Sequence, residues 1–312
     1  MSSTIIHYTS LDSSAPQLTG AAGSLIAILD ACLVNGYGSK SPAGWTKAYS
    51  GTNVASYRNP TTGGRNGVYL DVNDTNATYY TCRGYETMTA IDTGTEPFGV
   101  HANNSIGYKA SARWQLFACN KYVYFFPGQA ATFTPGTSAA SASGFMFGEF
   151  DTSIDFNKRN NFLIMSRTGG ASWTFVTGNV ATGSLAATPR RYLHRNSQLN
   201  YVTDGAPWFA RAPRAPVSPC MSASFGLRTA YDTSVVEAGF IEIMDGAQTT
   251  RRLGKLPGLA YSEASIASYS ENEVVTLNGQ EFQLVTVVGG TSASTSGSNV
   301  GGFLVQRTGT PL

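Results

Sequence analysis

The clearest pattern in the chain is a helical one near the N-terminus, where apolar residues recur at every third or fourth position. The members of this pattern are Leu25, Ile28, Leu29, Cys32 and Leu33. Such spacing places all of them on one buried face of an α-helix. We expect the side chain of Ser24 to cap the start of this helix and Asn35-Gly36 to end it.

Glycines, a lysine and serines follow the helix, as they do in some phosphate-binding loops; the segment 35–41 reads NGYGSKS. A phosphate-binding loop precedes its helix, because the free N–H groups that hold the anion lie at the helix start. Here the loop comes after the helix, and the G-x-x-x-x-G-K-S/T spacing is missing. We therefore interpret 35–41 as a helix end and expect no nucleotide or other cofactor.

After the helix, the pattern changes to short apolar runs separated by turn residues. In the run 67–73, apolar residues at every second position predict a strand with one buried face. Its two faces carry Val68, Leu70 and Val72 on one side and Tyr69, Asp71 and Asn73 on the other. Further strand-like runs are 43–50, 53–59, 78–86, 112–120, 122–128, 145–151, 160–167, 172–178, 190–195, 222–229 and 237–244.

The C-terminal segment 273–288 is the clearest hairpin, because Asn278-Gly279 suits a two-residue type I′ turn. The run 301–309 can add a strand beside it. Many short strands at near-regular spacing predict a mainly β protein, built of β-sandwich or small-barrel modules with one short N-terminal α-helix.

We divide the chain into three regions. They are the helix and hairpins of 1–98, a central β region of 99–250, and a C-terminal hairpin region of 251–312, which can pack against the N-terminal part. Three long segments rich in small residues or proline are interpreted either as partner-binding surfaces or as plain surface loops. These segments are 128–144, 206–220 and 289–302.

Charged residues make up only 13% of the chain, against roughly a quarter in typical soluble domains. This deficit is typical of an extracellular β protein or of a subunit covered by its neighbours. The net charge of +2 argues against nucleic acid as the main partner. The four cysteines are far apart and form no C-x-x-C, so we expect no metal site.

Aromatic residues and short basic runs are the candidate contact residues for a protein partner. The candidates are Trp45, Tyr49, Tyr85, Trp208, Arg211, Arg214, Arg251 and Arg252. Two alternatives remain open for the aromatic residues, namely packing in the core and stacking on sugars. The alternative for the arginines is a solvated surface.

Candidate catalytic chemistry is sparse. Glu149 and Asp151 lie two positions apart on a predicted strand, a spacing that can suit the two carboxylates of a glycosidase. An acidic hairpin edge has the same pattern, so a glycan hydrolase is the third of our hypotheses. The three histidines are isolated and no G-x-S-x-G motif is present. We therefore expect no catalytic residues and no enzyme activity.

The N-terminal segment 1–14 has neither a basic start nor an apolar stretch of signal-peptide length. The longest mostly apolar run, 25–34, is too short to span a bilayer and contains Asp30. We expect a soluble chain that is made in the cytoplasm and is not inserted in a membrane.

Three segments resemble a family of virion structural proteins of tailed bacteriophages. They are 29–53 (LDACLVNGYGSKSPAGWTKAYSGTN), parts of 66–98 (NGVYLDVNDT and RGYETMTAIDTGTEPF) and, more loosely, 251–260 (RRLGKLPGLA). The resemblance implies a protein without catalytic residues, which folds in the host cytoplasm and is then part of the particle.

The first functional hypothesis is therefore a virion protein that binds copies of itself and other virion proteins, in the tail, in the baseplate or as a minor capsid or decoration protein. The alternative is a receptor-binding or glycan-binding module on the virion, which would contact host surface glycans.

Overall fold

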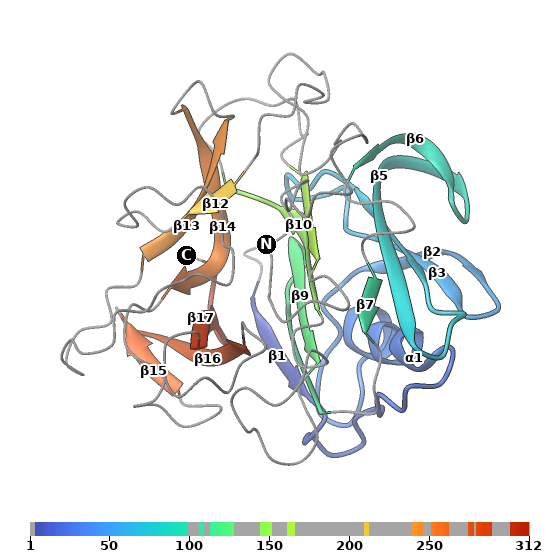
Figure 1. The fold of residues 1–312 in the computed structure, drawn as a ribbon, viewed down its shortest axis with the longest axis horizontal. Helices are drawn as coiled ribbons and strands as arrows, with labels where there is room; N and C mark the ends of the chain where they lie inside the picture. The colour runs from blue at the N-terminus through green and yellow to red at the C-terminus, as the bar shows by residue number, and fades with distance from the viewer. Residues whose placement is uncertain are drawn as a thin grey trace.

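Three antiparallel β-sheets and one short helical segment make up the described part of this computed structural model (Figure 1). The structure describes residues 4–98, 106–108, 113–127, 144–151, 161–165, 209–211, 239–245, 251–261, 274–277, 279–288 and 300–311. The predicted mainly β class with one short N-terminal helix is confirmed. The predicted strands at 172–178, 190–195 and 222–229 lie outside the described residues.

The middle sheet lies between the other two (Figure 1). Its order is β1 (Ile6–Thr9), β8 (Trp114–Ala118), β9 (Tyr122–Pro127), β10 (Phe145–Glu149) and β11 (Asn161–Met165). All residues of β9 and β10 are buried. Antiparallel sheets commonly have one face in water and alternate in polarity, but this sheet is covered on both faces. Its strands are therefore apolar almost without interruption.

The N-terminal sheet packs with the helix on its inner side. Its strands are β2 (Thr46–Gly51), β3 (Val54–Arg58), β4 (Tyr69–Asn73), β5 (Tyr79–Ala90) and β6 (Thr93–Phe98), with β7 (Ile106–Tyr108) paired to β5. The predicted division of β4 into two faces is confirmed, because Leu70 and Val72 belong to the main core cluster and Tyr69 to a separate one. The expectation of a single buried face was wrong, since Tyr69 and Asp71 on the other face are also buried and only Asn73 is exposed. The aromatic ring of Tyr80 reaches from β5 to the middle sheet, with its centroid 6.5 Å from Phe125 and 6.1 Å from Phe145.

The C-terminal sheet covers the opposite face of the middle sheet. Its order is β12 (Phe209–Arg211), β13 (Gly239–Asp245), β14 (Arg251–Tyr261), β17 (Val300–Gln306), β16 (Gln280–Val288) and β15 (Val274–Leu277). The predicted hairpin is confirmed, since Leu277 pairs with Gln280 and Gly279 has a φ of 76°. The hydroxyl of Tyr124 on the middle sheet donates a 2.8 Å hydrogen bond to the carbonyl of Pro257 on β14.

The sheets do not follow the order of the chain. The N-terminal strand β1 pairs with β8 in the middle sheet, and β12 and β13 from the central region join the C-terminal strands. Backbone contacts also connect the two ends of the chain, because the N–H of Ile5 donates to the carbonyl of Gly309 at 2.9 Å.

The helix is fixed at its start by Asp74, which is fully buried. The carboxylate of Asp74 accepts a 2.9 Å hydrogen bond from the N–H of Leu25, and its carbonyl accepts one from Gly23 at 3.0 Å. Its own N–H donates to the carbonyl of Asn53 at 2.9 Å. The predicted cap was wrong, because the buried hydroxyl of Ser24 has no partner among the described residues.

The helical segment has two parts, α1 (Ser24–Leu29) and the π-helix η1 (Asp30–Asn35). The predicted end is confirmed, since Gly36 follows with a φ of 77°, in the region that favours glycine. The hydroxyl of Tyr57 on β3 donates a 2.8 Å hydrogen bond to the carboxylate of Asp30, the first residue of η1. This contact connects the helical segment to the N-terminal sheet.

His7 on β1 is packed between polar and aromatic groups of the middle sheet. Its ring stacks on Phe117 with centroids 4.5 Å apart, and its Nε2 lies 3.1 Å from Oε1 of Gln115. Burial and then the positive charge of Arg307 lower the pKa of His7 from 6.5 to about 4.

We expect Asp74→Ala to lower the free energy of unfolding by about 1–3 kcal/mol, because it leaves a buried N–H of the helix start without a partner. Asp74→Asn keeps an acceptor oxygen and should lose less. Urea denaturation of the three proteins measures both differences. An equal loss for the two variants would contradict the role of the carboxylate as the cap.

We expect the protonation of His7 to destabilise the fold as the pH falls from 6.5 to about 4, the unfolded and folded pKa values. In this window the unfolded chain binds a proton that the folded chain excludes, so stability present above pH 6.5 is lost toward pH 4. The difference is on the order of 3 kcal/mol. His7→Gln cannot bind this proton, so denaturation curves should show a weaker pH dependence for the variant. Parallel curves for both proteins would contradict the prediction.

Candidate functional site

Two of the predicted contact residues pack inside the chain. Trp45 is 3% exposed, and its indole N–H donates a 2.7 Å hydrogen bond to the carbonyl of Cys119. Tyr85 is 2% exposed and lies in a small apolar cluster with Tyr69. For these two positions the structure supports the alternative of core packing. Tyr49 is half-buried, and its ring stacks on Tyr69 with centroids 6.3 Å apart.

The predicted basic contact residues lie on the C-terminal sheet or outside the described residues. Arg211 ends β12 opposite Glu242, and Arg251 begins β14 opposite Asp245. Arg252 is the next residue of β14, opposite Met244. Trp208 and Arg214 lie outside the described residues. The same holds for most of the three long segments 128–144, 206–220 and 289–302.

Glu149, the first of the two candidate carboxylates, is buried at the end of β10, where it joins two sheets. Its carboxylate accepts hydrogen bonds from the side-chain amide of Asn59 and, at 2.8 Å, from the N–H of Asn66. Arg65 lies 3.5 Å from its other oxygen, and the side chain is 3% exposed. Burial raises the pKa of Glu149, although the N–H of Asn66 and the charge of Arg65 act in the opposite direction.

Asp151 binds a different partner, the ammonium group of Lys121. Both carboxylates are thus held by groups of the protein, Glu149 by Asn59 and Asn66 and Asp151 by Lys121. The carboxylate of Glu149 is enclosed by the loop 59–67, where a polysaccharide does not reach it in this structure. This arrangement fixes the loop to the middle sheet and gives no support to the hydrolase hypothesis.

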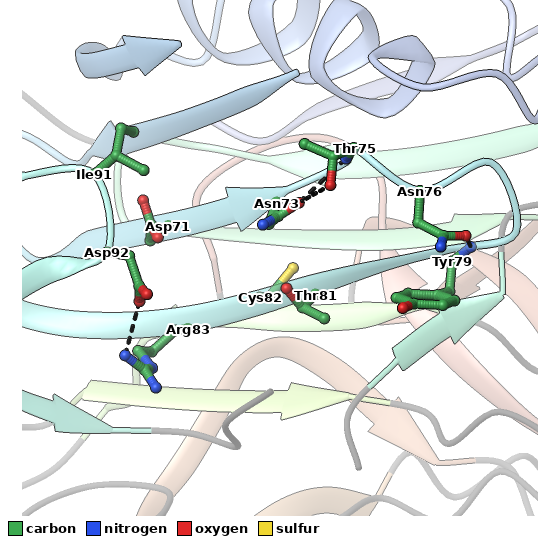
Figure 2. A pocket seen from close by; sticks show the side chains of 10 residues that line it. All are labelled: Asp71, Asn73, Thr75, Asn76, Tyr79, Thr81, Cys82, Arg83, Ile91 and Asp92. Carbon is green, nitrogen blue, oxygen red and sulfur yellow. Dashed lines mark hydrogen bonds and ion pairs between the residues drawn. The ribbon is translucent and has the colours of Figure 1, made fainter. Parts of the chain in front are cut away.

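A polar hollow lies on the outer face of the N-terminal sheet (Figure 2). Its floor is formed by β4 and β5, whose register places Asp71 opposite Arg83 and Asn73 opposite Thr81. The β4–β5 turn closes one end and the β5–β6 turn the other, as Figure 2 shows. The volume is about 340 Å³ and the lining residues are Asp71, Asn73, Thr75, Asn76, Tyr79, Thr81, Cys82, Arg83, Ile91 and Asp92.

Asp71 is the most enclosed carboxylate of this hollow, at 7% exposure. It accepts hydrogen bonds from the hydroxyl of Ser56 and from the backbone of Asp92. Burial raises its pKa and the charge of Asp92 adds to the effect, whereas the hydrogen bond from Ser56 and the charge of Arg83 oppose it. Asp71 therefore holds the β5–β6 turn over the sheet.

Arg83 and Asp92 form an ion pair of 2.8 Å at the same end of the hollow. The hydroxyl of Tyr85 donates to the same oxygen of Asp92 at 2.9 Å, and the guanidinium group of Arg83 lies 5.4 Å from the centre of the Tyr85 ring. The positive charge of Arg83 is thus balanced by Asp92, whose side chain is 65% exposed.

The sequence pattern identified only part of this hollow. The alternation on 67–73 placed Asp71 and Asn73 on the polar face of β4, and the alternation in 78–86 would place Thr81 and Arg83 on one face of β5. The alternation did not indicate Asp92 as a neighbour, because the β5–β6 pairing has a register shift between Met88 and Ala90, just before the turn that carries Asp92.

Within the described ranges, no helix has the length and composition needed to span a bilayer. In the same part of the chain, no three residues of the types His, Cys, Asp and Glu gather as ligands for a metal ion. No protein-family model matches the chain, and no curated protein is significantly similar to it.

We expect Glu149→Ala to lower the free energy of unfolding by about 2–4 kcal/mol, because it leaves buried donors and the charge of Arg65 without their acceptor. Asp151→Ala is the matched control, since it breaks a more exposed ion pair and should cost about 1 kcal/mol or less. Chemical denaturation measures both values. A loss of polysaccharide cleavage in both variants without a change in stability would instead support the hydrolase.

Proposed function

We propose that this chain is a structural protein of a tailed-phage virion, which acts by binding copies of itself and neighbouring virion proteins. The observation that carries the proposal is the resemblance of three segments to virion proteins. In the structure, the first two segments contribute strands to the same sheet, on either side of β3 (Val54–Arg58). Segment 29–53 runs from the end of α1 through β2, and segment 66–98 contains β4, β5 and β6.

The third resembling segment, 251–260, forms most of β14. This strand contacts the middle sheet through the hydrogen bond between Tyr124 and Pro257. All three segments are thus parts of the folded framework, which is where a likeness among proteins that share an architecture is expected.

The low content of charged residues, 13%, also favours assembly. Surfaces in permanent assemblies are more apolar than those of transient complexes and commonly bury 2,000 Å² or more. Repeated contacts around a symmetric particle add up to a durable structure even when each contact is modest.

Glycan binding on the virion remains the second candidate, because the polar hollow on the outer face of the N-terminal sheet offers carboxylate, amide and hydroxyl groups together. A glycan site and a structural role are compatible, since the hollow uses one face of one sheet.

The proposed function predicts that the chain is a stoichiometric component of mature particles. Purified virions of the phage that encodes it should yield its peptides in mass spectrometry, in a fixed ratio to the major capsid protein. Gold-labelled antibodies against the chain should mark one location on each particle. A phage replication enzyme serves as the control that purification must remove. Absence of the chain from pure particles would refute the proposal.

A further inference from the structure

The polar hollow contains hydrogen-bond donors that the fold holds in place but does not use. Oδ1 of Asn73 accepts hydrogen bonds from the N–H and the hydroxyl of Thr75, at 3.1 and 2.7 Å. Oδ1 of Asn76 accepts from the N–H of Thr78 at 2.7 Å. These contacts fix both amide groups, so their NH₂ groups are held in defined directions. Neither NH₂ group has a partner in the described ranges.

An exposed aromatic ring lies at the same end of the hollow. Tyr79 is 36% exposed, and only Leu11 and Val274 join it as exposed large apolar side chains among the described residues. Figure 2 shows its ring near Asn76, at the end of the β5 strand that also carries Thr81. The hollow therefore combines a flat apolar surface with fixed polar groups, as small-molecule sites commonly do.

The charges of the lining disfavour an anionic ligand. Among the described residues of the lining, Arg83 is the only one with a cationic side chain, and it is already paired with Asp92. Asp71 adds a second carboxylate, so the formal charge of these three groups is negative. A phosphate, a sulfate or an acidic sugar would meet carboxylates without a free cation.

From these observations we propose that the hollow binds a neutral saccharide. A neutral sugar ring has C–H groups that pack on an aromatic face such as Tyr79, and hydroxyl groups that both donate and accept. The amide NH₂ groups of Asn73 and Asn76 would donate to its oxygens, and carboxylate oxygens of the lining would accept from its hydroxyls. The volume of about 340 Å³ lies at the small end of the range for ligand sites. One or two sugar rings match this size.

This inference rests on the second candidate of the proposed function, glycan binding, and does not depend on the assembly function. The saccharide test uses the isolated full chain, whereas the virion test uses particles. A chain that is found in particles but binds no sugar would leave the first proposal standing. A chain that binds sugar but is absent from particles would leave the second standing.

The experiment is a titration of the full-length chain with a fixed panel of neutral oligosaccharides, containing glucose, galactose, mannose, rhamnose or N-acetylglucosamine units. Ligand-observed NMR detects binding and calorimetry measures the dissociation constant. Wild-type protein should bind at least one panel member with a dissociation constant in the millimolar range or tighter. Sialyllactose and glucosamine serve as the anionic and cationic probes and should bind at least tenfold more weakly.

Three variants identify the site. Asn73→Asp keeps the oxygen that accepts from Thr75 but removes the NH₂ donor, and Tyr79→Ala removes the exposed ring. Each should weaken binding at least tenfold with an unchanged thermal unfolding midpoint. Thr89→Val changes an exposed hydroxyl on the same strand outside the hollow and should bind as wild type does.

The proposal is overturned if no neutral member of the panel binds. It is equally overturned if the anionic or cationic probe binds more tightly than every neutral one, or if binding is unchanged in both Asn73→Asp and Tyr79→Ala.

Discussion

The burial of the middle sheet on both faces is the constraint on which the rest of the structure depends. Strands β9 and β10 have no exposed residue, so neither face of this sheet is stable in water without a cover. The helix and the N-terminal sheet cover one face through residues such as Trp45 and Tyr80, and β14 of the C-terminal sheet covers the other. Apolar burial of this extent is the main stabilising contribution in a β protein.

Polar contacts then set how the layers are placed. Asp74 joins the helix start to the N-terminal sheet, and Glu149 joins the loop 59–67 to the middle sheet. Each carboxylate is buried and accepts hydrogen bonds from residues far away in the sequence. A buried carboxylate is costly unless its acceptor positions are filled, so these contacts restrict the layers to one arrangement.

Features that depend on local sequence could be predicted, and features that depend on distant neighbours could not. The helix face, the alternation on β4 and the turn at Gly279 follow from spacing within a few residues.

The prediction that Ser24 caps the helix was wrong, because Asp74, 49 positions from Leu25, supplies the acceptor instead. The burial of Trp45 could not be predicted from the residues around it, because its hydrogen-bond partner is the carbonyl of Cys119, 74 positions away. In the hollow, strand alternation identified Asp71 and Asn73, but it gave no sign of Asp92, which follows a register shift between Met88 and Ala90.

The pairing of β1 with β8 has a consequence for how the chain folds during its synthesis. His7 and Gln115, which contact each other through their side chains, are separated by 108 positions. The first strand therefore leaves the ribosome long before its neighbour exists, and it cannot be paired until more than a third of the polypeptide has been translated. Contacts of such long sequence separation slow folding and leave apolar strands open to aggregation in the meantime.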